Sequence, residues 1–93
     1  MKRKAIIRFL NTLEGGRLNP PCSGYKPQIR IGEILTSCKI IPEDVNVGIM
    51  DFEIEHKVFI ELQFESLYGD KIVKGMKINL FEGSKLIATG AFV

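Results

Sequence analysis

The sequence predicts an all-β fold, and three observations lead to this prediction. Short runs of residues alternate apolar and polar side chains with a period of two, as half-buried strands do. Glycine and proline residues separate these runs at turns. No stretch shows a sustained helical period with caps, so a parallel sheet with crossover helices is not expected. We therefore expect one antiparallel barrel or sandwich spanning residues 1–93, because a chain of this length can bury a single modest core.

The first half of the chain contains two or three of the expected strands. Residues 3–10 form the first strand, and one of its faces carries three apolar side chains, those of Ala5, Ile7 and Phe9. Residues 27–31 form the next strand, with Ile29 and Ile31 pointing inward. Residues 34–40 continue after Gly32-Glu33, either as another strand or as the same strand past a bulge.

The second half contains the clearest alternation. Residues 57–65 are predicted as a strand whose core face carries Val58, Ile60, Leu62 and Phe64. Before it, residues 45–50 are apolar enough for a short strand, although Gly48 weakens that prediction. After it, Tyr68-Gly69-Asp70 predicts a turn. The last two strands, 76–81 and 86–93, form a hairpin in which Gly83 supplies a positive φ.

The most specific stretch is the connection from Glu14 to Ile31. It contains two adjacent glycines, three prolines and a Ser-Gly pair, so we expect it to be ordered without being regular. Connections of this length in a small domain are uncommon, and ordered ones tend to cover an opening or present a surface.

Two motifs follow one another along the chain. The first consists of Phe9-Leu10, Glu14-Gly15-Gly16-Arg17 and Ser23-Gly24-Tyr25-Lys26-Pro27-Gln28. The second runs from Gly75 to Lys85 and is followed by Thr89-Gly90. With these motifs the chain resembles the C-terminal, third β-barrel domain of elongation factor Tu and related translation GTPases. The resemblance implies a six- or seven-stranded Greek-key barrel of the translation-factor type, here without a GTPase domain.

The resemblance also implies candidate site residues. In elongation factor Tu, the residues that match Arg17, Gln28, Glu82 and Gly83 lie on the surface that meets the T arm of aminoacyl-tRNA, and Ser37 stands where the family usually has threonine. A contact with tRNA or other structured RNA that reads the backbone rather than the sequence is therefore implied. We expect a second set of residues to shape the loop, namely Gly15, Gly16, Gly24, Tyr25 and Pro27. Considered by itself, the Arg17 guanidinium can reach phosphate or simply tether the loop through carbonyl and carboxylate contacts.

The composition argues against an enzyme. The chain contains neither Gly-x-x-x-x-Gly-Lys-Ser/Thr nor Gly-x-Gly-x-x-Gly, the two glycine motifs that bind phosphate groups. It has one histidine and two cysteines, and these do not have the spacing of metal ligands. We therefore expect no catalytic residue, metal or cofactor. His56 is expected at the surface, and Cys22 and Cys38 as buried small side chains, with exposure left open for Cys22 because it lies in the loop. The formal charge of +2 is too small to identify a partner. Three alternatives to RNA therefore stay open: a protein partner, self-association, and a small-ligand binder or enzyme with a pocket at the end of the barrel formed by the loop 14–27. No signal peptide or membrane segment is recognised, so a cytoplasmic location is expected.

Overall fold

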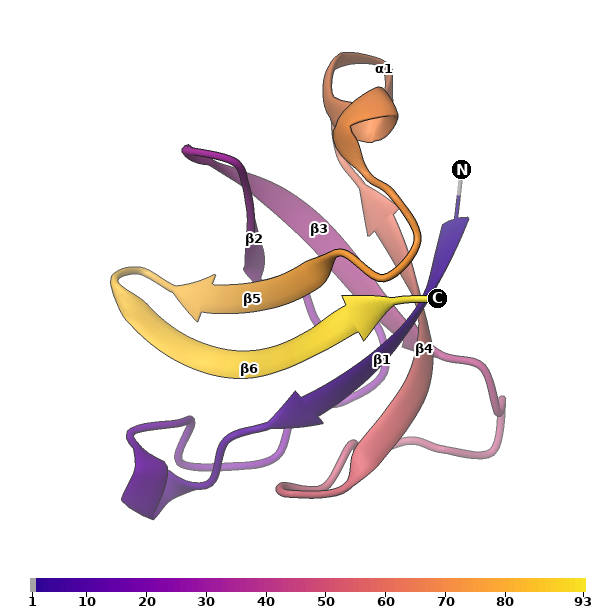
Figure 1. Cartoon of the computed structure of the whole chain (residues 1–93). Coiled ribbons are helices and arrows are strands. Elements are labelled where there is room, and N and C mark those ends of the chain that lie inside the picture. The colour runs from indigo at the N-terminus through magenta and orange to yellow at the C-terminus, as the bar shows by residue number, and fades with distance from the viewer. Residues whose placement is uncertain (1) are drawn as a thin grey trace.

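The computed structural model describes residues 2–93 and shows a closed barrel of six antiparallel strands (Figure 1). The strands are β1 (Lys2–Phe9), β2 (Gln28–Ile31), β3 (Ile34–Pro42), β4 (Glu55–Leu62), β5 (Lys77–Glu82) and β6 (Lys85–Phe92). The helical elements are a 3-10 turn, η1 (Thr12–Glu14), one short helix, α1 (Glu65–Tyr68), and a second 3-10 turn, η2 (Gly69–Lys71). The predicted all-β antiparallel barrel is confirmed, with six strands.

The order of the strands around the barrel is β1-β4-β3-β2-β5-β6, and β6 closes the barrel against β1. Three consecutive strands, β2, β3 and β4, form a meander, and β1 lies beside β4 although a long connection separates β1 from β2 in the chain. This is the arrangement of a Greek key. Closure leaves every strand with a neighbour on both sides, which reduces the exposed backbone edge that an open sheet would have.

The core is built from the inward positions of all six strands. The residues predicted to point inward on β1 and β2 are buried, and so are those predicted on β4 from Val58 to Leu62. Phe64, however, was wrongly predicted to lie in the core, and its side chain is 48% exposed. The reason is that β4 ends at Leu62, so the alternation no longer determines which way the Phe64 side chain points when the chain turns into α1.

Two connections differ from their predictions. Residues 45–50 form no strand, and only Ile49 makes an isolated bridge, to Cys22. The predicted turn at residues 68–70 is instead the junction of α1 and η2. Arg3 on β1 fixes this junction by donating hydrogen bonds to the Glu65 carboxylate at 2.7 Å and to the Gly69 carbonyl at 2.8 Å.

Two connections lie at the lower end of the barrel in Figure 1, namely the loop 10–27 with η1 and the loop 43–54. The β5–β6 turn lies at the left of that view, and Glu82 beside it accepts a hydrogen bond from Arg17 of the loop 10–27. The segment 63–76 with α1 lies toward the opposite end, as does the chain's N-terminal side. Within residues 2–93, no helix is both long and apolar enough to cross a membrane.

Candidate nucleic-acid interface

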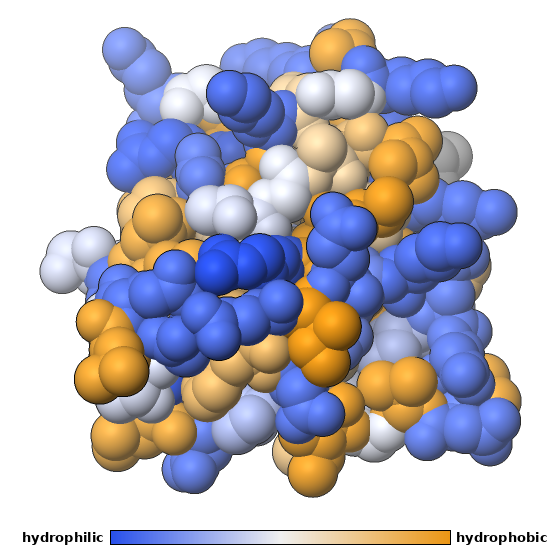
Figure 2. Space-filling view, turned by 60° about the horizontal axis from the view of Figure 1, so that its bottom comes forward, coloured by the Kyte–Doolittle hydropathy of each residue, from blue (hydrophilic) through white to orange (hydrophobic). Residues whose placement is uncertain are grey.

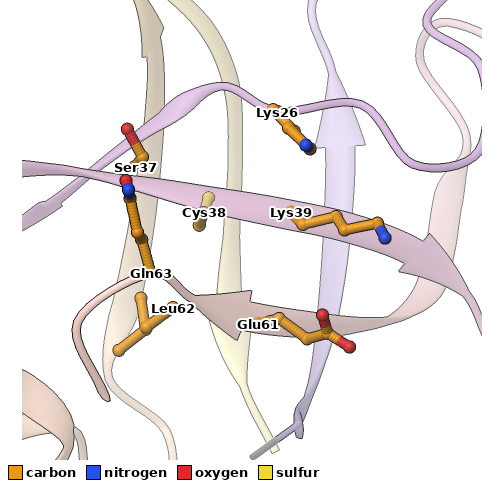
Figure 3. Close-up of a pocket in the computed structure, with 7 residues that line it drawn as sticks. All are labelled: Lys26, Ser37, Cys38, Lys39, Glu61, Leu62 and Gln63. Carbon is orange, nitrogen blue, oxygen red and sulfur yellow. The ribbon is translucent and has the colours of Figure 1, made fainter. Parts of the chain in front are cut away.

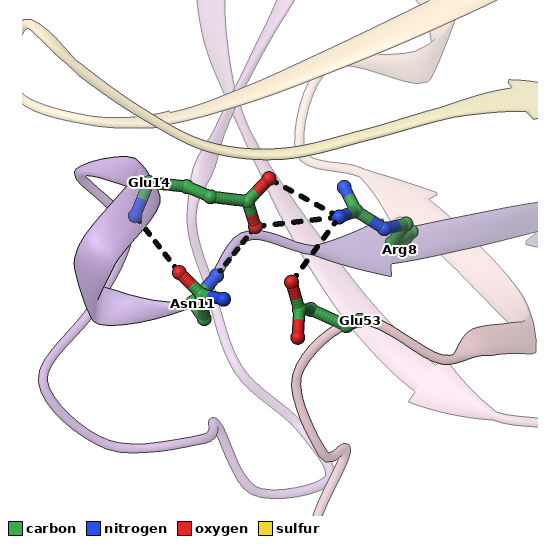
Figure 4. A network of polar contacts seen from close by, with 4 residues as sticks. All are labelled: Arg8, Asn11, Glu14 and Glu53. Atoms are coloured by element: carbon green, nitrogen blue, oxygen red, sulfur yellow. Dashed lines mark hydrogen bonds and ion pairs between the residues drawn. The ribbon is translucent and has the colours of Figure 1, made fainter.

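The loop 10–27 is fixed at its start by a capping box. The Asn11 side chain accepts a hydrogen bond from the Glu14 amide at 2.8 Å, and the Glu14 carboxylate accepts one from the Asn11 amide at 3.1 Å (Figure 4). Arg8 on β1 reaches the same carboxylate at 3.2 Å and lies 3.7 Å from Glu53. These contacts, first the backbone hydrogen bond of Asn11 and then Arg8, lower the pKa of Glu14 below its ordinary value. Arg8 is therefore engaged by two acids.

The two glycines that follow have different roles. Gly15 ends η1 in the left-handed region, at a φ of 85°. Gly16 lies so close to β1 that a Cβ atom there would be 2.1 Å from the Leu10 carbonyl oxygen. The pair thus allows the loop to turn and then to pack directly on the backbone that precedes it. Gly24 also lies in the left-handed region, at a φ of 87°, which favours glycine at this turn.

Arg17, Tyr25 and Glu82 form one cluster. The Arg17 guanidinium lies 4.5 Å from the centre of the Tyr25 ring, and the Glu82 carboxylate accepts hydrogen bonds from both side chains. The Arg17 Nε also donates to the Asn19 carbonyl at 3.1 Å. Arg17 therefore tethers the loop through a carbonyl and a carboxylate, which is one of the two roles expected for it.

The cluster also sets the charge of its members. Burial, followed by the hydrogen bond to Glu82, raises the pKa of the Tyr25 phenol above its ordinary value. Partial burial alone would lower the pKa of Arg17, but the contacts with Tyr25 and Glu82 outweigh it and raise that pKa. Tyr25 is thus a neutral donor and Arg17 a permanent cation at neutral pH.

The remaining predicted residues lie on the strands next to this cluster. Gln28 pairs with Ser37 on β3 and with Phe81 on β5, so the three residues form one row across the outer face. Glu82 follows Phe81, and Gly83 occupies the adjoining turn at a φ of 62°. All five candidate RNA-contacting residues therefore belong to one side of the barrel, and the side chains of Arg17 and Glu82 are joined by a hydrogen bond.

A groove lies beside the row. Its volume is about 330 Å³, and seven residues line it, namely Lys26, Ser37, Cys38, Lys39, Glu61, Leu62 and Gln63. In Figure 3 the two lysines point the same way, and Ser37 and Gln63 lie toward the other end of the groove. Pro27 borders the strand pairing here, because its carbonyl accepts a hydrogen bond from the Cys38 amide at 3.1 Å.

Charge is distributed unevenly over this side. The strands β2, β3 and β5 carry three basic residues, Arg30, Lys39 and Lys77, and Glu82 is their single acid. Within residues 2–93, none of these three nor Lys26 lies within 4.0 Å of an acidic group, whereas Arg17 neutralises Glu82. We call the outward side of β2, β3 and β5, together with Arg17, Tyr25 and Lys26, the cationic face.

Sequence reasoning missed Arg30, Lys39, Lys77 and Phe81. Arg30 stacks over the Phe81 ring, with its guanidinium carbon 5.2 Å from the ring centre. The signal that was available is that the outward positions of 28–31, 34–42 and 77–81 contain no acid. That signal becomes meaningful only when β2 is known to pair with both β3 and β5.

The two cysteines and the single histidine differ in their exposure. Cys38 is buried as predicted, whereas Cys22 lies exposed on the loop, which is the alternative that was left open for it. His56 is half-buried and makes a 2.8 Å hydrogen-bond contact between its Nε2 and the Asp51 carbonyl. In the part of the chain that the structure describes, no group of three or more His, Cys, Asp or Glu residues has the geometry of a metal site. No protein-family model matches the chain.

Proposed function

We propose that this barrel is a non-catalytic module that binds the backbone of structured RNA, such as tRNA, through the cationic face. The observation that carries the proposal is the segregation of charge. Lys26, Arg30, Lys39 and Lys77 share this side of the barrel without acidic partners in residues 2–93. Phosphate groups supply the counter-charge that such a surface lacks, and they dominate the affinity of proteins for nucleic acids.

Hydrogen-bonding groups among these cations suit a sugar-phosphate backbone. Ser37 and Gln63 line the groove together with Lys26 and Lys39, and Glu61 is the one acid among its seven lining residues. An anionic oxygen bound on the side of Lys26 and Ser37 therefore meets both a cation and a neutral donor. Phe81, on the same face, offers an aromatic surface beside Arg30. Backbone recognition by such groups is independent of base sequence.

Arg17 is positioned for the same task. Its tether occupies donors toward Asn19 and Glu82, and a guanidinium has five N–H donors in total, so others remain for a phosphate. The tether fixes the direction of the side chain, which reduces the conformational entropy that binding would otherwise cost. The resemblance to the third domain of elongation factor Tu supports this reading, since the residues that match Arg17, Gln28, Glu82 and Gly83 lie on the tRNA-facing surface of that domain, and Ser37 keeps the hydroxyl of the threonine usual there.

The test is binding of the purified chain to aminoacylated and deacylated tRNA by fluorescence anisotropy across a salt series. We expect the logarithm of the binding constant to fall linearly with the logarithm of salt concentration, as counterions are released. Lys39→Ala and Arg17→Ala should each weaken binding and reduce the salt slope by about one. Lys74→Ala is the matched control, because Lys74 is exposed on the segment 63–76, outside the cationic face.

Two results would overturn the proposal. One is no binding to either tRNA at about 50 mM salt, where phosphate contacts are strong. The other is an equal effect of Lys39→Ala and Lys74→Ala, since binding would then depend on overall charge and not on the cationic face.

A further inference from the structure

The segment 43–56 between β3 and β4 is strongly acidic. It contains five of the eleven acidic residues of the chain and none of the thirteen lysines and arginines. The acids are Glu43, Asp44, Asp51, Glu53 and Glu55. Within residues 2–93, only Glu53 among these five takes part in an ion pair, with Arg8 at 3.7 Å. The segment therefore presents uncompensated negative charge, the opposite of the cationic face.

The same segment exposes large apolar side chains. Val45 is 94% exposed, Ile49 56% and Ile54 52%. Figure 2 views the barrel with this lower end turned forward, and hydrophobic side chains emerge there between hydrophilic ones. Apolar side chains that are exposed together on one connection are typical of contact surfaces between proteins.

The backbone of the segment is hydrogen-bonded to the loop 10–27 and, through the Glu53 amide and the Phe9 carbonyl, to the end of β1. The Ser23 amide donates to the Gly48 carbonyl at 2.9 Å, and the Met50 amide donates to the Pro21 carbonyl at 2.8 Å. The Met50 side chain is fully buried in the core. Val45, Ile49 and Ile54 are thus presented from an ordered backbone, so a partner would not have to order the loop as it binds.

A hollow at the base of the segment completes the surface. Its volume is about 290 Å³, and its lining residues are Pro42, Glu43, Asp44, Val47, Glu55, His56 and Lys57. Three carboxylates border it against one lysine. A guanidinium or ammonium group on a flexible apolar stem matches this combination of apolar wall and acidic rim.

We propose that the segment 43–56 docks a cationic amphipathic stretch of a protein partner. A lysine or arginine of the partner enters the hollow among Glu43, Asp44 and Glu55, and apolar side chains pack on Val45 and Ile54. Charge complementarity selects this occupant, because five acids repel RNA and anionic lipid surfaces alike. The surface is separate from the cationic face, so the inference does not depend on the proposed RNA contact.

The test is selection of a random-peptide display library on the full chain, followed by affinity measurements on the enriched peptides by fluorescence anisotropy. We expect the enriched peptides to combine lysine or arginine with leucine, isoleucine or phenylalanine. Their affinity should fall about tenfold or more for the triple variant Glu43→Gln, Asp44→Asn, Glu55→Gln and for Val45→Ser. The control variants Glu33→Gln and Lys39→Ala, on other surfaces, should leave it unchanged.

Three outcomes would overturn the inference. They are a library that yields no enriched peptide, enriched peptides without basic residues, and an affinity that the triple variant leaves unchanged. A fourth outcome comes from analytical ultracentrifugation of the chain without peptide. If the chain forms a dimer that the triple variant dissociates, the segment 43–56 binds a second copy of this chain and not a cationic partner. Binding of tRNA is measured in parallel, and the triple variant should retain it.

Discussion

Replacement of Gly90 by alanine tests how the barrel is closed. Gly90 lies in the middle of the five-residue register between β6 and β1, opposite Ile7. A Cβ atom at this position would be 2.1 Å from the Ile6 carbonyl oxygen and 3.0 Å from the Ile7 Cα atom. Both contacts are with backbone, so no side-chain rotation can relieve them. The two strands must instead move apart by about 1 Å to restore an ordinary contact distance.

The expected cost follows from that displacement. Overpacking in a close-packed interior costs about 1–3 kcal/mol, and weakening one or two neighbouring ladder hydrogen bonds adds about 1 kcal/mol each. We therefore expect Gly90→Ala to lower the free energy of unfolding by about 4 kcal/mol. A domain of 93 residues has a total of about 5–14 kcal/mol, so the variant should retain about 1–10 kcal/mol and unfold at a clearly lower denaturant concentration.

The assay is equilibrium unfolding in guanidinium chloride, with Gly48→Ala as the matched control. A Cβ atom at Gly48 would meet no atom within 4 Å, and the φ there is not positive. That substitution should leave stability within about 0.5 kcal/mol or raise it slightly, because alanine restricts the unfolded chain. The reasoning is refuted if Gly90→Ala costs less than about 1 kcal/mol, or if both variants behave alike.

Two further predictions concern ionisable groups. The pKa of Glu14 is lowered in the folded state by Asn11 and Arg8, so its contribution to stability is present above the ordinary value of 4.5 and is lost as pH falls through the folded pKa. Glu14→Gln should therefore show a smaller loss of unfolding free energy between about pH 6 and about pH 3 than the natural chain; an equal loss would contradict this. Burial raises the pKa of Cys38 to about 12, and Cys22 is exposed, so a chromogenic disulfide reagent at about pH 8 should titrate one thiol in the folded chain and two after unfolding. Two fast-reacting thiols in the folded state would show that Cys38 is accessible.

The candidate site could be predicted only in part, because its residues come from distant parts of the sequence. The motif around Arg17 drew attention to the right loop, and Glu82 was named through the second motif. The carboxylate contact between them joins positions 65 residues apart, and no local pattern specifies it. Lys39 and Lys77 could not be added to the site from the sequence, because which strands neighbour β2 is decided when the barrel closes.

Local alternation was enough to predict the six strands that form and the inward faces of β1, β2 and β4, although it also predicted a strand at residues 45–50 that does not form. A period of two is a local property of extended backbone, so the alternation in residues 57–62 sufficed to place Val58, Ile60 and Leu62 in the core. The tertiary structure decided what happens where that period stops. Phe64 lies outside because β4 has ended, and Met50 is buried while its neighbour Ile49 is exposed because hydrogen bonds to the loop 10–27 fix that segment. Strand order and register depend on contacts between residues far apart in the chain, and they placed Arg30, Lys39 and Lys77 on neighbouring strands of the barrel.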